Sequence, residues 1–158
     1  MVSLVRSVYL LSRMMPWVLR RMCLSGLAGG PFVVVSLFLP FMKFYIDDQQ
    51  VTWVEFWRTG AALIFIVLGF YLALMGLGIL LRRPYGRFMA LGFIVLPTAF
   101  MMVQPQEEGM AFVRLFAALP ALAMTWYLFF KPSVEAYFNL PKLTIRDVLT
   151  PTSDTVGR

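Results

Sequence analysis

Few side chains in this chain could do acid–base or metal chemistry, and those few lie between long apolar segments. The carboxylates that precede residue 130 are Asp47, Asp48, Glu55, Glu107 and Glu108. Two carboxylates can serve together as general acid and general base. Here each would stand exposed on a short loop with no cleft around it, so we predict no active site and no small-molecule substrate.

The residues that usually hold metals and cofactors are almost absent. The chain has no histidine and a single cysteine, Cys23. For this chain alone, that composition excludes histidine-ligated haem, a histidine-assisted hydrolase, a zinc site built on thiolates and an internal disulfide. We therefore expect a protein that is not an enzyme and that holds no cofactor, with lipid as the one bound molecule expected.

The elements that must carry these loops are four long stretches with almost no charge. They cover residues 22–42, 59–81, 88–106 and 109–130, and only Arg114 interrupts the last. About 20 apolar residues in a helix cross a hydrocarbon core of about 30 Å. Hydrophobic residues make up 60% of the 158 residues and charged residues 14%, whereas soluble domains have roughly 45–50% and 25%. The sequence predicts an all-α, polytopic integral membrane protein with four transmembrane helices.

The net charge of +6 is distributed unevenly over the segments between these stretches. Eleven basic residues fall on one side of the predicted membrane: Arg6, Arg13, Arg20, Arg21, Arg82, Arg83, Arg87, Lys131, Lys142, Arg146 and Arg158. The other side has Lys43, Arg58 and Arg114. The positive-inside rule then places both termini on the cytoplasmic side of the membrane, which we expect to be a bacterial inner membrane. The charge indicates topology and attraction to anionic lipid, not nucleic-acid binding.

The chain divides into three parts around the predicted transmembrane domain at 22–130. Residues 1–21 are expected to form an interfacial amphipathic helix, because Arg6, Arg13 and Arg20 recur every seven residues. Pro16 is expected to bend this helix or to start a second segment. We expect Arg6, Arg13, Arg20, Arg82 and Arg83 to contact lipid headgroups. Residues 131–158 form a cytoplasmic tail that either docks on a partner or lies on the membrane surface.

Small residues recur at helical spacing in three of the four stretches, and such stripes let helix backbones approach closely. The residues are Gly26 and Gly30, then Gly69, Ala73 and Gly76, and finally Ala117 and Ala121. We expect them to pack helices together and to contact partner subunits, since four helices in one chain rarely need so many close-approach faces.

The external loop holds the most distinctive local pattern. Thr52 and Glu55 have capping-box spacing, and Trp53, Phe56 and Trp57 share one face of the short helix that the cap would start. This external aromatic patch either anchors the chain at the outer membrane interface or recognises a partner.

These observations favour a protein that functions by binding other membrane proteins. A proton-coupled transporter needs a carboxylate in the membrane, and a channel needs a polar pore lining; the predicted spans offer neither. The first hypothesis is a non-catalytic accessory, assembly or scaffold subunit of a larger inner-membrane complex. The alternatives are a small immunity, exclusion or regulatory protein that binds one membrane target, and a homo-oligomeric transport protein.

Overall fold

The computed structural model describes residues 2–39, 43–46, 49–103 and 111–149, and within these ranges the side chains of 2–6, 46, 101–103, 111–115 and 117 stay outside the description. The fold is mostly helical, which confirms the all-α prediction. In chain order the elements are α1 (Val2–Arg13), α2 (Trp17–Ser36), β1 (Phe44–Ile46), β2 (Gln49–Val51), α3 (Trp53–Arg58), α4 (Ala61–Leu80), α5 (Pro84–Val103), α6 (Ala111–Phe130), α7 (Pro132–Asn139) and α8 (Ile145–Leu149).

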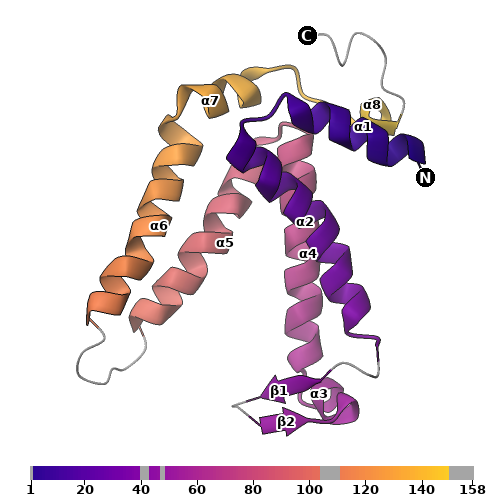
Figure 1. The fold of residues 1–158 in the computed structure, drawn as a ribbon, viewed down its shortest axis with the longest axis vertical. Helices are drawn as coiled ribbons and strands as arrows, with labels where there is room; N and C mark the ends of the chain where they lie inside the picture. The colour runs from indigo at the N-terminus through magenta and orange to yellow at the C-terminus, as the bar shows by residue number, and fades with distance from the viewer. Residues whose placement is uncertain (1, 40–42, 47–48, 104–110, 150–158) are drawn as a thin grey trace.

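The four long helices form two pairs (Figure 1). Helices α2 and α4 run side by side, and α5 and α6 form a second pair that diverges from the first with distance from α7. The pairs join at the turn between α4 and α5, where a Cβ on Gly86 would lie 2.6 Å from the backbone of Gly78 and Ile79. Further along the two helices, the Tyr71 hydroxyl donates a hydrogen bond of 2.6 Å to the Met89 carbonyl. The close contact between α4 and α5 is thus near their shared turn.

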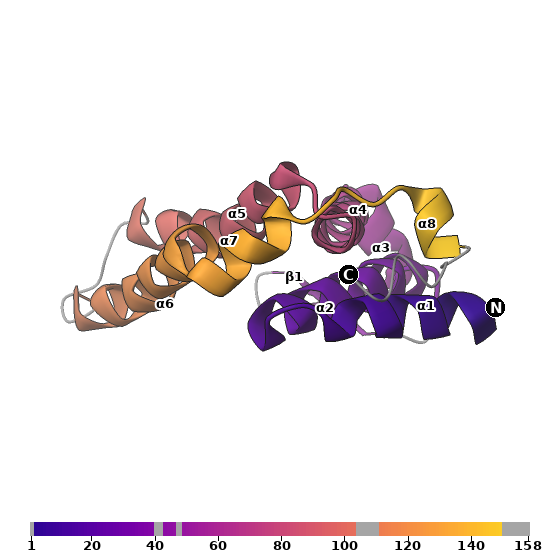
Figure 2. The same ribbon diagram turned by 90° about the horizontal axis from the view of Figure 1, so that it is seen from above.

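Helices α1, α7 and α8 cover this same end of the molecule, and Figure 2 shows α1 and α8 side by side there. Their apolar side chains join those of α2 and α4 in the main buried cluster, which includes Leu11, Leu19, Ile79, Val134 and Val148. We call this region the basic end, because it includes Arg13, Arg82, Arg83, Lys131 and Arg146.

The opposite end of the α2–α4 pair carries β1, β2 and α3 (Figure 1). The two strands pair antiparallel, with Phe44 opposite Val51 and Tyr45 opposite Gln50. The sequence did not predict these strands, since three-residue segments are too short to show an alternating pattern. Gly60, with a φ of 79°, turns the chain from α3 into α4.

Helix bounds differ from the predicted stretches chiefly at α2. That helix starts at Trp17, five residues before residue 22, because Pro16 occupies the N-cap with an extended backbone. Of the two expectations for Pro16, the start of a second segment is confirmed, so residues 1–21 are not one continuous helix: α1 ends at Arg13, and Arg20 belongs to α2. The other three long helices begin and end within four residues of the predicted stretches.

Two helices in the described ranges are long and apolar enough to cross a membrane, namely α2 and α4. The apolar stretch Ala118–Phe130 of α6 is shorter than such a span. Large apolar side chains are nevertheless exposed along α5 and α6 as well. These findings agree weakly with a membrane location, and the four-span arrangement stays a prediction.

Candidate functional site

The basic end contains a buried arginine that ties the chain's tail to the α4–α5 turn. Helix α4 ends in a Schellman motif, in which the Arg83 amide donates to the Gly78 carbonyl at 2.9 Å and the Arg82 amide donates to Ile79 at 3.1 Å. Arg82 takes the left-handed position of this motif, with a φ of 57°. This conformation costs a non-glycine residue about 1 kcal/mol, so its side-chain contacts must offset that cost.

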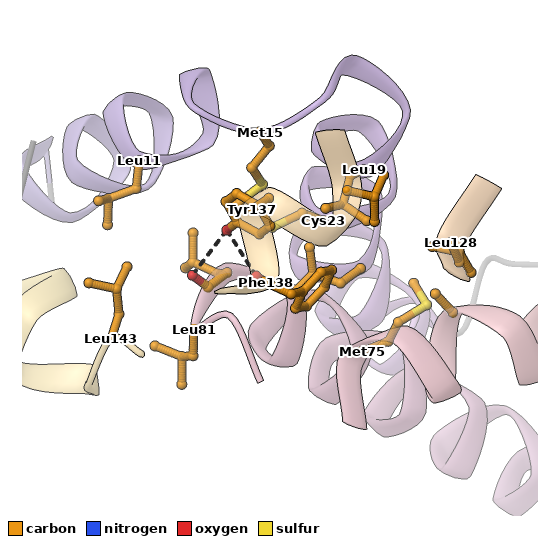
Figure 3. Packing of buried hydrophobic residues seen from close by; sticks show 14 of the residues in the cluster. Leu11, Met15, Leu19, Cys23, Met75, Leu81, Leu128, Tyr137, Phe138 and Leu143 are labelled. Atoms are coloured by element: carbon orange, nitrogen blue, oxygen red, sulfur yellow. Dashed lines mark hydrogen bonds between the residues drawn. The ribbon is translucent and has the colours of Figure 1, made fainter. Parts of the chain in front are cut away.

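Those contacts join Arg82 to the segment that follows α6. Its Nη1 donates to the Pro141 carbonyl at 3.0 Å, and its guanidinium lies 5.5 Å from the Tyr137 ring centre. Tyr137 in turn donates its hydroxyl hydrogen to the Ile79 carbonyl at 3.0 Å (Figure 3). Burial raises the pKa of Tyr137 well above its usual range, although the nearby Arg82 charge opposes the rise. The phenol therefore stays protonated and remains a donor.

Arg87 makes a second tie of the same kind. Its Nη2 donates to the Val134 carbonyl at 3.2 Å, and its guanidinium lies 4.3 Å from the Phe138 ring centre. Together the two arginines hold α7 and the Pro141 turn against the start of α5. The part of the tail from Pro132 to Leu149 is thus folded onto its own chain, which neither predicted alternative for the tail anticipated.

The predicted headgroup contacts separate into two groups. Arg82 is only 4% exposed, so that prediction is wrong: the left-handed turn points its side chain under the tail. Arg13 is exposed, while Arg20 and Arg83 are half-buried, so these three can reach the surface. The side chain of Arg6 lies outside the described residues.

The small residues of α2 and α4 pack against each other. A Cβ on Gly30 would lie 2.5 Å from the Gly69 carbonyl oxygen and 2.8 Å from the Ala73 amide nitrogen, and a Cβ on Gly26 would lie 2.6 Å from the Leu72 carbonyl oxygen. Gly76 faces Cys23, whose thiol donates to the Gly76 carbonyl at 3.3 Å. The close contacts of these small residues are therefore made within the chain.

The third stripe of small residues, on α6, is only partly described. Ala121 is 8% exposed, whereas the Ala117 side chain lies outside the description. The Arg114 side chain lies outside it as well.

The external aromatic residues form a small core, not an exposed patch. Phe56 is 2% exposed and stacks on Phe44 with ring centres 4.1 Å apart. Trp53 donates its indole hydrogen to the Leu37 carbonyl at 2.9 Å, which connects α3 to the end of α2. Trp57 packs on the exposed Phe38 at 5.3 Å. Of the predicted external aromatic patch, Phe56 is therefore buried, because Phe44 of β1 packs on it.

The predicted capping box is present at the start of α3. The Thr52 amide and hydroxyl both donate to the Glu55 carboxylate, at 2.9 and 2.8 Å, and the Glu55 amide donates back to Thr52. These hydrogen bonds lower the pKa of Glu55. Thr144 and Asp147 repeat the same pattern at the start of α8.

No group of three or more histidine, cysteine, aspartate or glutamate residues that could hold a metal ion occurs among the described residues. No family model, curated protein or solved structure matches the chain. The features of the described residues that bear on function are two surfaces, the basic end and the outer faces of the long helices.

Proposed function

We propose that this protein is a non-catalytic accessory, assembly or scaffold subunit of a larger complex in a bacterial inner membrane. The observation that supports the proposal is the exposure of large apolar side chains on each of the four long helices. Examples are Phe32 on α2 at 69%, Ile64 on α4 at 70%, Leu96 on α5 at 65% and Leu122 on α6 at 66%. Water would penalise such a surface, while lipid tails or partner helices would cover it.

The proposed topology has four spans, with both termini and the α4–α5 turn in the cytoplasm. The support is geometric as well as electrostatic. Helices α1, α7 and α8 and the α4–α5 turn share the basic end, and β1, β2 and α3 lie at the far end of the α2–α4 pair (Figure 1). One end is therefore rich in arginine and lysine, as the positive-inside rule requires of a cytoplasmic face.

We assign partner contact to the α5–α6 pair. The α2–α4 pair closes through its small residues, whereas α5 and α6 diverge from it and expose Phe93, Leu96, Phe100, Phe116 and Leu119. A transmembrane helix of another subunit could pack there through van der Waals contact.

The complex can be tested by blue-native electrophoresis of a tagged chain extracted in mild detergent. We expect the wild type to migrate with a heteromeric assembly and Leu96→Ala/Leu122→Ala to lose that assembly. The matched control is Phe32→Ala/Ile64→Ala, which removes equally exposed side chains from the other pair and should co-migrate normally. A free monomer or a defined homo-oligomer in the wild type would contradict the proposal.

The topology can be tested separately by cysteine labelling in a Cys23→Ser background. Gln49→Cys lies in the exposed strand β2 and should react with a membrane-impermeant maleimide added outside intact cells. Lys142→Cys, exposed at the basic end, should react only after the membrane is permeabilised. The reverse pattern would overturn the orientation and leave the test of the complex unaffected.

A further inference from the structure

The outward face of α2 carries a basic hollow at its first two turns. The hollow has a volume of about 420 Å³ and is lined by Trp17, Arg20, Arg21 and Leu24. These residues are spaced at i, i+3, i+4 and i+7, so they share one helix face. The opposite face, with Leu19, Cys23, Gly26 and Gly30, is buried against the rest of the chain. The hollow therefore opens away from the α2–α4 contact.

Aromatic rings hold both arginines in place. The Arg21 guanidinium lies 5.4 Å from the Trp17 ring centre, and the Arg20 guanidinium lies 5.1 Å from that of Tyr9 on α1. A guanidinium group that stacks on an aromatic ring can still donate N–H hydrogen bonds from its edge. Among the described residues, the contacts recorded for these two guanidinium groups are with aromatic rings and not with a carboxylate. Two adjacent guanidinium groups without a carboxylate suit a phosphate oxygen, which accepts forked hydrogen bonds.

The hollow also has the polarity gradient of a membrane interface. Trp17 is 65% exposed at the start of the helix, and indole rings favour the headgroup level. Leu24 lies one turn beyond Arg20 and Arg21 toward the apolar middle of α2. A second hollow of about 540 Å³ shares Trp17 with the first and is also lined by Lys131 and Ser133.

We propose that this hollow binds one anionic phospholipid, with its phosphodiester between Arg20 and Arg21 and an acyl chain along Leu24. Basic pockets at the cytoplasmic ends of transmembrane helices bind anionic headgroups in this manner. The inference rests on the membrane location in the proposed function, but it requires no partner subunit.

The test uses the full chain, stripped of lipid, in mixed micelles that contain phosphatidylglycerol or phosphatidylcholine with brominated acyl chains. Bromine quenches nearby tryptophan, and a Trp17→Phe variant identifies the part of the signal that comes from Trp17. We expect phosphatidylglycerol to quench Trp17 at a lower mole fraction than phosphatidylcholine does. Arg20→Gln/Arg21→Gln should weaken that binding on the order of tenfold.

The matched control is Lys142→Gln/Arg146→Gln, which removes the same charge from exposed positions of the tail outside the hollow. It should change phosphatidylglycerol binding by less than about twofold. An equal loss of binding in both double variants would show that the lipid is attracted by the overall positive charge and would overturn the site. Equal quenching by the two lipids in the wild type would overturn it as well. Circular dichroism and size-exclusion chromatography of each variant separate loss of binding from loss of fold.

Inorganic phosphate distinguishes the two sources of this chemistry. Added at millimolar concentration against chloride of equal ionic strength, it should leave the quenching by phosphatidylglycerol in place. Displacement by inorganic phosphate alone would show that the hollow takes a soluble phosphate, and it would overturn the assignment to lipid. Because the micelles contain no other subunit, this experiment can fail while the electrophoresis test of the complex succeeds, and the reverse.

Discussion

The two helix pairs of this molecule are built from the same kinds of apolar residue and are packed in opposite ways. In the α2–α4 pair, glycine and alanine bring the backbones together, and Gly30 and Gly76 each face backbone atoms of the other helix. In the α5–α6 pair, contact is made by large side chains such as Phe88 and Phe129, with ring centres 5.5 Å apart. Both pairs expose large apolar side chains on their outer faces. We call α2–α4 the closed pair, because its two backbones are in contact, and α5–α6 the open pair, because these two helices diverge from the first pair.

The largest loss of stability should come from Gly30→Leu, which separates the two helices of the closed pair. A side chain at Gly30 meets the Gly69 carbonyl and the Ala73 amide, which are backbone atoms that cannot rotate away. We expect the free energy of unfolding in detergent, measured by titration with a denaturing surfactant, to fall by about 3 kcal/mol. Gly29→Leu is the matched control, because nothing lies within 4 Å of a Cβ there. An equal loss in both variants would contradict the packing described for α2 and α4.

The second largest effect should be a faster proteolytic cleavage of the tail in Arg82→Ala. The substitution removes the hydrogen bond to the Pro141 carbonyl and the contact with Tyr137. A hydrogen bond from a charged group contributes about 2 kcal/mol, so proteolytic cleavage between α7 and α8 should become roughly 30-fold faster. Arg83→Ala, one residue away and half-buried, should leave the cleavage rate nearly unchanged. Equal cleavage of both variants would show that Arg82 does not hold the tail.

Arg82 also shows why the sequence predicted the helices better than their surroundings. A long apolar run is a local signal, and it located α2, α4, α5 and α6 to within one or two turns; the Thr52–Glu55 cap is equally local and is present. Burial of Arg82 depends on Pro141 and Tyr137, which belong to the tail and are distant from it in the sequence. Burial of Phe56 depends on Phe44 in strands too short to show a period.

The stripes of small residues were predicted in part: the sequence identified the residues but not their contacts. Their spacing identified Gly26, Gly30, Gly69, Ala73 and Gly76 as sites of close approach, because helical periodicity alone places them on common faces. Spacing does not specify which face meets which, so the sequence left partner contact open for residues that the chain uses internally. The choice between an internal and an external partner is a tertiary property.

A smaller effect should be a loss of local stability at the start of α3 when the pH is lowered. Hydrogen bonds from Thr52 lower the pKa of Glu55 in the folded chain. A carboxyl group whose folded pKa is lowered stabilises the fold above its unfolded pKa, and that contribution is lost as the pH falls through the folded value. We expect acidification from neutral pH to a pH below the folded pKa to speed hydrogen exchange at the Glu55 amide, after correction for the intrinsic exchange rate. Glu55→Gln should remove most of this pH dependence, and Asp147→Asn, in the equivalent cap of α8, should keep it.

The smallest effect on the isolated chain should come from truncating the open pair. Leu96→Ala/Leu122→Ala removes side chains that are 65% and 66% exposed. The free energy of unfolding in detergent should therefore change by no more than about 0.5 kcal/mol. The same variant is expected to lose its partner assembly, and this combination separates a contact surface from a structural one. A stability loss as large as that of Gly30→Leu would instead mean that α5 and α6 pack against the rest of the chain through these leucines. The distinction between a closed pair and an open pair would then no longer hold.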